Sequence, residues 1–167
     1  AFAAAQIVDR SLKHKAAKAR IAIASTLAAG VGATPIPFAD AALLVPIQTG
    51  MMASISQIYR LPMDSALAVS LAATALATNA GRTLVTGTLK LIPGAGTVVG
   101  GAVAATVAST FTVAMGQAWV RVCEMMVDGK FGPIERLDNG KIQSVFLGEF
   151  KSLFAASLSS LKRDRSN

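Results

Sequence analysis

The feature that most constrains the fold is a run of thirty residues without a charge, from Leu91 to Val120. Residues four apart share one face of a helix, and in this run one such row is small while the next is mostly large. The small-residue row is Gly96, Gly100, Ala104, Ala108, Thr112 and Gly116, and the large row is Val99, Val103, Val107, Phe111, Met115 and Trp119. The run therefore predicts a helix with one smooth side and one bulky side that must be buried.

The small-residue row predicts close helix–helix contact, because only small side chains let two helix backbones come inside the usual separation of about 8–10 Å. We expect Gly96, Gly100, Ala104 and Ala108 to form this contact, with Gly100 and Ala104 at the nearest approach. A contact of this kind can also join subunits, so a homo-oligomer is expected.

The charges point to an anionic partner. The chain has a net charge of +7, and five cations lie within eleven residues near its start. This basic cluster is Arg10, Lys13, Lys15, Lys18 and Arg20. Such a cluster suits lipid headgroups or nucleic acid. Aromatic residues that could stack on bases make up only 5% of the chain and no recognition motif is present, so we expect no nucleic acid partner. An anionic membrane surface or an acidic protein remains.

Hydrophobic periodicity favours an all-α fold, a compact bundle of about five helices in one domain spanning 1–167. The expected elements are helices over 1–29 and 39–60, a helix from 65 ending at a cap over 79–81, a short piece over 82–91, a long Gly/Ala-rich central helix from 93 to 127, a loop over 128–140 and an amphipathic helix over 141–162. Asp64 is expected to cap the third helix, and Pro46 to kink the second helix rather than end it.

Three apolar rows support the individual helices. The first helix has Val8, Leu12, Ala16, Ala19, Ile23 and Leu27. The second helix has Leu44, Ile47, Met51, Ile55 and Ile58 as its buried row, and Thr49, Ser56 and Arg60 as its polar row. The last helix has Ile142, Val145, Phe146, Phe150, Leu153, Phe154, Leu158 and Leu161. Glycines and prolines over 30–37 are expected to end the first helix.

No catalytic set, cofactor site or metal site emerges from the sequence. The glycines over 94–100 resemble a dinucleotide fingerprint, but the preceding segment is predicted to be helical rather than the strand that such a site requires. His14 lies among lysines, where a solvated face is expected. The only cysteine, Cys123, excludes an internal disulfide and is expected to pack inside the fold. For Trp119 and Tyr59, a membrane-interface position and core packing both remain open.

Whether a helix enters a membrane stays open at this point. A spanning helix needs about 20 apolar residues, and of the uncharged runs only 91–120 is clearly long enough. Its Ala, Gly, Ser and Thr residues contribute little to insertion, and the same composition suits a tightly packed soluble bundle. Membrane association is slightly favoured, and a soluble module for oligomerisation or partner binding is the alternative. Because the chain starts at Ala1 without a signal peptide, we expect a piece of a longer or processed protein.

Two motifs resemble a known family. The residues 34–41, Thr-Pro-Ile-Pro-Phe-Ala-Asp-Ala, are followed by 46–51, Pro-Ile-Gln-Thr-Gly-Met, and later by 89–101, Leu-Lys-Leu-Ile-Pro-Gly-Ala-Gly-Thr-Val-Val-Gly-Gly. Over residues 5–127 the chain resembles the uncharacterised helical domain that follows the G domain of bacterial Era-like GTPases and is related to the YcjF group of inner-membrane proteins. The resemblance implies a non-catalytic effector or anchoring domain beside a GTPase domain in the same polypeptide, in the bacterial cytoplasm at the inner-membrane face or partly inserted.

Overall fold

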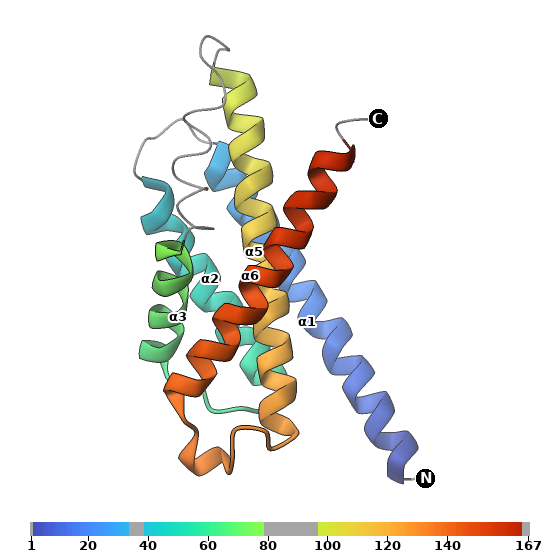
Figure 1. Ribbon diagram of the computed structural model, residues 1–167. Coiled ribbons are helices and arrows are strands. Elements are labelled where there is room, and N and C mark those ends of the chain that lie inside the picture. Colours follow the sequence, from blue (N-terminus) through green and yellow to red (C-terminus); the bar gives the residue numbers. More distant parts are fainter. Residues whose placement is uncertain (1, 34–38, 79–96, 165–167) are drawn as a thin grey trace.

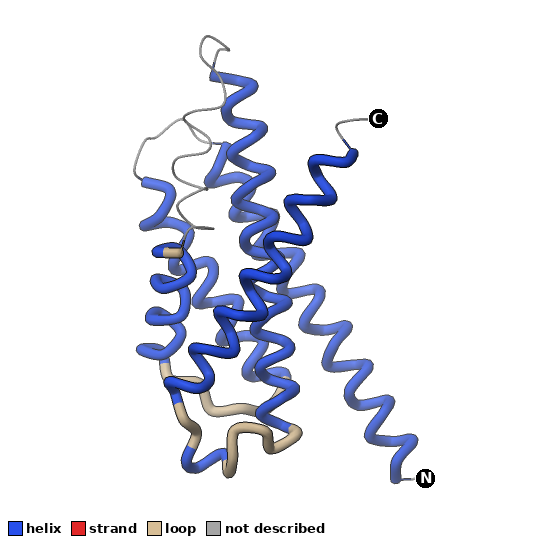
Figure 2. The backbone as a smooth tube through the Cα atoms, in the orientation of Figure 1, coloured by secondary structure: helices blue, strands red, loops and turns tan. Residues whose placement is uncertain are grey.

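A computed structural model describes residues 2–33, 39–78 and 97–164, and Figures 1 and 2 show the helices in space. The described elements are the helices α1 (Phe2–Ala33), α2 (Ala39–Ile58), α3 (Ser65–Ala77), α5 (Thr97–Val127) and α6 (Asn139–Asp164), and a short 3-10 helix, η1 (Ile134–Arg136). These ranges contain five α-helices and no strand, so the prediction of an all-α bundle is confirmed. The short piece predicted over 82–91 and the start of the central helix at 93–96 lie outside the described residues.

Helix α5 is the centre of the bundle. It packs against α1, α2 and α6, while α3 packs against α2 and α6. Figure 1 shows α6 crossing α5 and the N-terminal half of α1 extending away from the other helices. The core beside α5 contains stacked and edge-on aromatic rings: the Phe111 and Phe150 ring centroids are 4.9 Å apart, and those of Trp119 and Phe146 are 6.1 Å apart.

The apolar rows predicted for α2 and α6 lie where expected. Leu44, Met51 and Ile55 of α2 are buried. Ile142, Phe146, Phe150 and Phe154 of α6 are also buried, each with at most 2% of its surface exposed. Asp64 caps α3 as predicted, because its side chain accepts a hydrogen bond of 2.9 Å from the Ala66 amide. Pro46 lies inside α2 without ending it.

Two details of the sequence-based prediction are wrong. Helix α1 does not break at Gly30 but continues through Gly32 to Ala33, because its last turn packs on α5 and tertiary contact outweighs the low helix propensity of glycine. Ser56, placed in the polar row of α2, is buried. The apolar row that indicated α1 is not its packed face, since Leu12, Ile23 and Leu27 are exposed.

Two helices end in the same hydrogen-bond pattern but with different residues in the left-handed position. At the end of α2, the Leu61 amide donates to the Ser56 carbonyl and the Arg60 amide to the Gln57 carbonyl. The same pair of bonds closes α5 around Gly129. Arg60 has a φ of 57°, and Gly129 has a φ of 73°. This is the Schellman motif, in which glycine avoids the steric penalty that a side chain incurs.

Arg60→Gly should therefore raise the free energy of unfolding by about 1 kcal/mol, because the left-handed conformation costs an L-residue about 1–2 kcal/mol and glycine's greater unfolded-state entropy offsets part of the gain. The matched variant Gly129→Ala should lower the free energy of unfolding by a similar amount. Urea unfolding of both variants checks the prediction. A loss of stability in Arg60→Gly would mean that the arginine side chain makes a contact more valuable than the relief of strain.

Candidate functional site

Helix α1 has two faces of different composition, and only one of them packs against the bundle. The packed face consists of Ala17, Ile21, Ala24, Ala28 and Gly32, all buried. These residues follow steps of three and four, so they lie on one side of the helix. Four of the five are alanine or glycine, which lets the α1 backbone come close to α5.

The closest approach is at Gly32. A Cβ atom built on Gly32 would lie 2.9 Å from the Ala104 carbonyl oxygen and 3.1 Å from the Ala108 Cβ. Ala104 and Ala108 therefore contact α1 of the same chain. Gly100 lies in the first turn of α5, and Gly96 lies outside the described residues. Contact of this row with another subunit stays a prediction.

The opposite face of α1 carries exposed apolar side chains. Leu12 is 61% exposed, Ile23 55% and Leu27 56%. At about 100° per residue, these three and the exposed Ala16 and Ala19 form one continuous row, the outer stripe, on the side away from α5. Large apolar side chains in a continuous exposed row are a common mark of a surface that binds a partner or a membrane.

The basic cluster divides between the two faces. The Arg10 guanidinium forms an ion pair with Asp128 at 2.5 Å, and Lys13 pairs with Asp9 at 2.6 Å. Lys13, which belongs to the basic cluster expected at the surface, is partly buried. The other three, Lys15, Lys18 and Arg20, are exposed and form no ion pair with any described residue. By helical angle, Lys15 and Arg20 lie next to the outer stripe, one on each side, whereas Lys18 lies about 100° from the nearest stripe residue, closer to the packed face. The stripe is therefore flanked by unneutralised positive charge.

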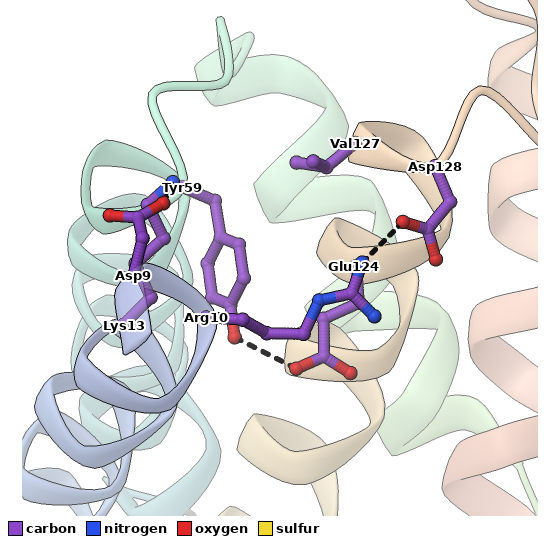
Figure 3. A pocket seen from close by; sticks show the side chains of 7 residues that line it. All are labelled: Asp9, Arg10, Lys13, Tyr59, Glu124, Val127 and Asp128. Atoms are coloured by element: carbon purple, nitrogen blue, oxygen red, sulfur yellow. Dashed lines mark hydrogen bonds and ion pairs between the residues drawn. The ribbon is translucent and has the colours of Figure 1, made fainter. Parts of the chain in front are cut away.

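A small polar pocket of about 290 Å³ lies where α1 meets the ends of α2 and α5, as Figure 3 shows. Its residues are Asp9, Arg10, Lys13, Tyr59, Glu124, Val127 and Asp128. The Tyr59 hydroxyl donates a hydrogen bond of 3.1 Å to Glu124, and His14 Nδ1 lies 3.5 Å from the same carboxylate. Burial, together with the Glu124 carboxylate, raises the pKa of Tyr59 far above its ordinary value. Tyr59 therefore stays protonated.

The contacts of this pocket hold α1 on the end of α5 and join the end of α2 to the same helix. Its carboxylates are already paired with Arg10, Lys13, His14 and Tyr59. Within the described ranges, no group of three or more His, Cys, Asp or Glu residues could hold a metal ion. His14 is exposed, as expected for a solvated face, and also lies beside Glu124.

The remaining candidate residues have structural positions. Trp119 is 1% exposed and Tyr59 4%. Of the two positions left open for them, a membrane interface or the core, both residues therefore occupy the core. Cys123 is fully buried, and burial raises the pKa of its thiol to about 12. Met51, Met52 and Met126 are buried in the same core as Cys123.

One described helix is apolar enough to cross a membrane by length and composition. It spans Gly101–Val127, with a mean hydropathy of 1.3, and 50% of its most apolar window is buried inside the chain. A central helix of a soluble bundle has the same properties, so this feature alone decides nothing about insertion.

The sequence contains the apolar row of the outer stripe, but in the sequence analysis this row served only as evidence for a helix. Leu12, Ile23 and Leu27 were recognised as a helical row, and Lys15, Lys18 and Arg20 as basic residues. Their combination, an apolar row between cations, is typical of helices that lie at a membrane interface. The structure adds that this row is left uncovered by the other described helices.

Comparison with known proteins gives one family. The model of a domain of unknown function, DUF697, matches residues 3–145. The match includes both sequence motifs and extends past the residues 5–127 of the resemblance into the first turns of α6. No curated protein and no solved structure matches the chain.

Proposed function

Because the chain belongs to the DUF697 family, a domain whose function is unknown, we propose that it is a non-catalytic helical domain that docks on an anionic membrane surface through the outer stripe of α1. One observation carries the proposal: an exposed apolar row lies between cations that have no acidic partner among the described residues.

The dimensions suit a helix lying in the membrane interface. From Leu12 to Leu27 the stripe extends for about 22 Å at about 1.5 Å per residue. An interfacial helix buries its apolar face about 5–10 Å deep, at the boundary of headgroups and acyl chains. Lysine and arginine at the flanks can then extend their alkyl stems over the apolar surface and place their charges among lipid phosphates.

The expected energies are sufficient for reversible docking. Fully burying a Leu or Ile side chain contributes about 1.5–3 kcal/mol, and each of the three large stripe residues still has half or more of its surface exposed. Each cation near an anionic surface adds about 1 kcal/mol. Apolar burial and charge attraction therefore contribute a few kcal/mol each. Together they are enough for reversible binding, which salt should weaken by screening the charges.

Pairing with a second copy through the same stripe is the rival proposal. It would bring Lys15 and Arg20 of two copies towards one another, and like charges that meet across an interface oppose association. An anionic lipid surface neutralises the same charges. The charge pattern therefore favours lipid over self-association at this face.

Sedimentation with vesicles containing one third phosphatidylglycerol tests the docking. Lys15→Gln should weaken binding about fivefold, which corresponds to about 1 kcal/mol. The matched variant Lys151→Gln removes an exposed charge from α6 and should change binding by less than twofold. Equal losses in the two variants would show a non-specific charge effect, and binding to neutral vesicles of equal strength would also contradict the proposal.

We extend the proposal to the context that the motif resemblance implies, a G domain in the same polypeptide, with this chain as its anchoring or effector part at the inner-membrane face. The support is the resemblance and the lack of a catalytic set in the sequence. Sequencing the natural polypeptide tests it. A G domain preceding this chain is expected, and a polypeptide without one would contradict this part while leaving the docking proposal intact.

A further inference from the structure

The apolar core is divided into two clusters. The small cluster contains Ala28 of α1, Leu44 of α2 and Ala108 of α5. The large cluster includes Ile21 of α1, Met51 of α2 and Met115 of α5. Two separate clusters on the same three helices imply that something other than apolar side chains lies between them.

The residues between the clusters are polar, and they come one from each helix. On α1 and α5, Ala28 is clustered with Ala108, and a Cβ built on Gly116 would contact Ile21. Ser25 of α1 and Thr112 of α5 therefore lie between those two levels. On α2, Leu44 is clustered with Ala108, and the same Gly116 Cβ would lie 3.0 Å from the Met51 sulfur. Gln48 therefore lies at this level too. We call Ser25, Gln48 and Thr112 the polar layer.

Two members of the polar layer are buried without partners. Gln48 and Thr112 have no exposed surface, and neither Gln48 Nε2 and Oε1 nor Thr112 Oγ1 has a hydrogen-bond partner in the structure. Thr106 and Thr110 of the same helix bond to the carbonyl four residues back, but Thr112 does not. A buried polar group left unsatisfied costs about 1–3 kcal/mol, so a hydrogen-bonding partner at this level would stabilise the bundle.

The chemistry of the layer selects that partner. The Gln48 amide offers two N–H donors and a carbonyl acceptor, a hydroxyl both donates and accepts, and Ser25 Oγ already donates to the Ala22 carbonyl and can still accept. None of these groups is charged, and the adjoining layers are apolar, so an ion would enter without compensation. A small neutral molecule that donates and accepts at once fits the set.

We propose that the polar layer binds internal water, which bridges Gln48 of α2 to Thr112 of α5. Buried waters occur about once per 27 residues and join otherwise unsatisfied polar groups. Here the bridge links α2 to α5 at a level between two apolar clusters. Apolar contacts are not directional, so the bridge would help to fix the position of α2 along α5. The proposal is independent of membrane docking, because the layer is buried on the inside of the bundle.

Two measurements test the water site in the intact chain. Nuclear magnetic resonance should show cross-relaxation between the Gln48 side-chain amide protons and a long-lived water. Water relaxation dispersion should then count at least one long-lived water fewer in the double variant Gln48→Leu/Thr112→Val. The control Thr110→Val, which removes a hydroxyl bonded within its own helix, should leave the count unchanged.

The outcome that overturns the proposal is a Gln48 amide with no cross-relaxation to water, because the amide would then be paired directly with protein. An unchanged water count in the double variant would also overturn it. If the double variant does not fold, the measurement on the unaltered chain decides alone. Apolar replacement of both groups should leave the chain folded, since removing both partners of a buried polar contact is nearly neutral.

Discussion

Trp119→Ala should lower the free energy of unfolding by about 3–5 kcal/mol, the usual range for deleting a large aromatic side chain from a core. Trp119 is 1% exposed and packs edge-on against Phe146 of α6. Its indole Nε1 donates to the Met52 carbonyl at 3.1 Å and to Ser56 Oγ at 3.0 Å. One side chain thus joins α5 to both α2 and α6.

The variant Trp119→Phe separates packing from hydrogen bonding. It keeps a ring against Phe146 but removes the N–H donor, and the Ser56 hydroxyl still donates to the Met52 carbonyl. We expect a loss of about 1–2 kcal/mol, close to the net value of a buried hydrogen bond with some lost volume. Urea unfolding measures both variants. A loss below about 1 kcal/mol for Trp119→Ala would place the indole at a surface rather than in the core.

The same substitution at two glycines of α1 should have opposite effects. Gly32→Ala places a Cβ against the Ala104 backbone, which cannot move without separating α1 from α5. We expect a loss of about 1–3 kcal/mol from overpacking. At Gly30 a Cβ meets nothing within 4 Å, so Gly30→Ala should instead gain up to about 1 kcal/mol from helix propensity.

Thermal and urea unfolding of these two variants compare close packing with propensity directly. The two glycines lie in the same last turns of α1, so position along the helix does not distinguish them. Equal effects at both positions would mean that α1 and α5 are not in close contact at Gly32. A change of oligomeric state in Gly32→Ala would show that the small-residue row also joins subunits.

Elements that depend on local signals were predictable from the sequence. The α6 stripe was identified because phenylalanines recur at a clear helical spacing, and Asp64 because a capping carboxylate acts within its own turn. The end of α5 at Val127 also followed from the Asp128-Gly129 turn. In these cases the residues that form the element also carry the signal.

The faces of α1 were not predictable in the same way. Hydrophobic periodicity gives weight to large side chains, so it selected Leu12, Ile23 and Leu27 and passed over the alanines and Gly32 that pack on α5. Close approach depends on what the neighbouring helix presents, and no property of α1 alone reports it. The polar layer was hidden for a related reason, because Gln48 and Thr112 are buried only through the relative positions of three helices.

The central claim, that α1 turns its apolar and basic outer face to a membrane, is tested most directly by a fluorescent probe on that face. Cys123 is buried and its pKa is raised to about 12, so its thiol stays protonated near neutral pH and a new surface cysteine can be labelled selectively. Ile23→Cys places an environment-sensitive dye on the outer stripe. Val69→Cys places the same dye at a site of similar exposure, 48% against 55%, on α3, which is a different helix.

On adding anionic vesicles, the dye at position 23 should brighten and shift its emission to the blue as it enters the interface, while the dye at position 69 stays unchanged. Neutral vesicles should produce neither effect at either position. An unchanged emission at position 23, or an equal shift at both positions, would contradict the account.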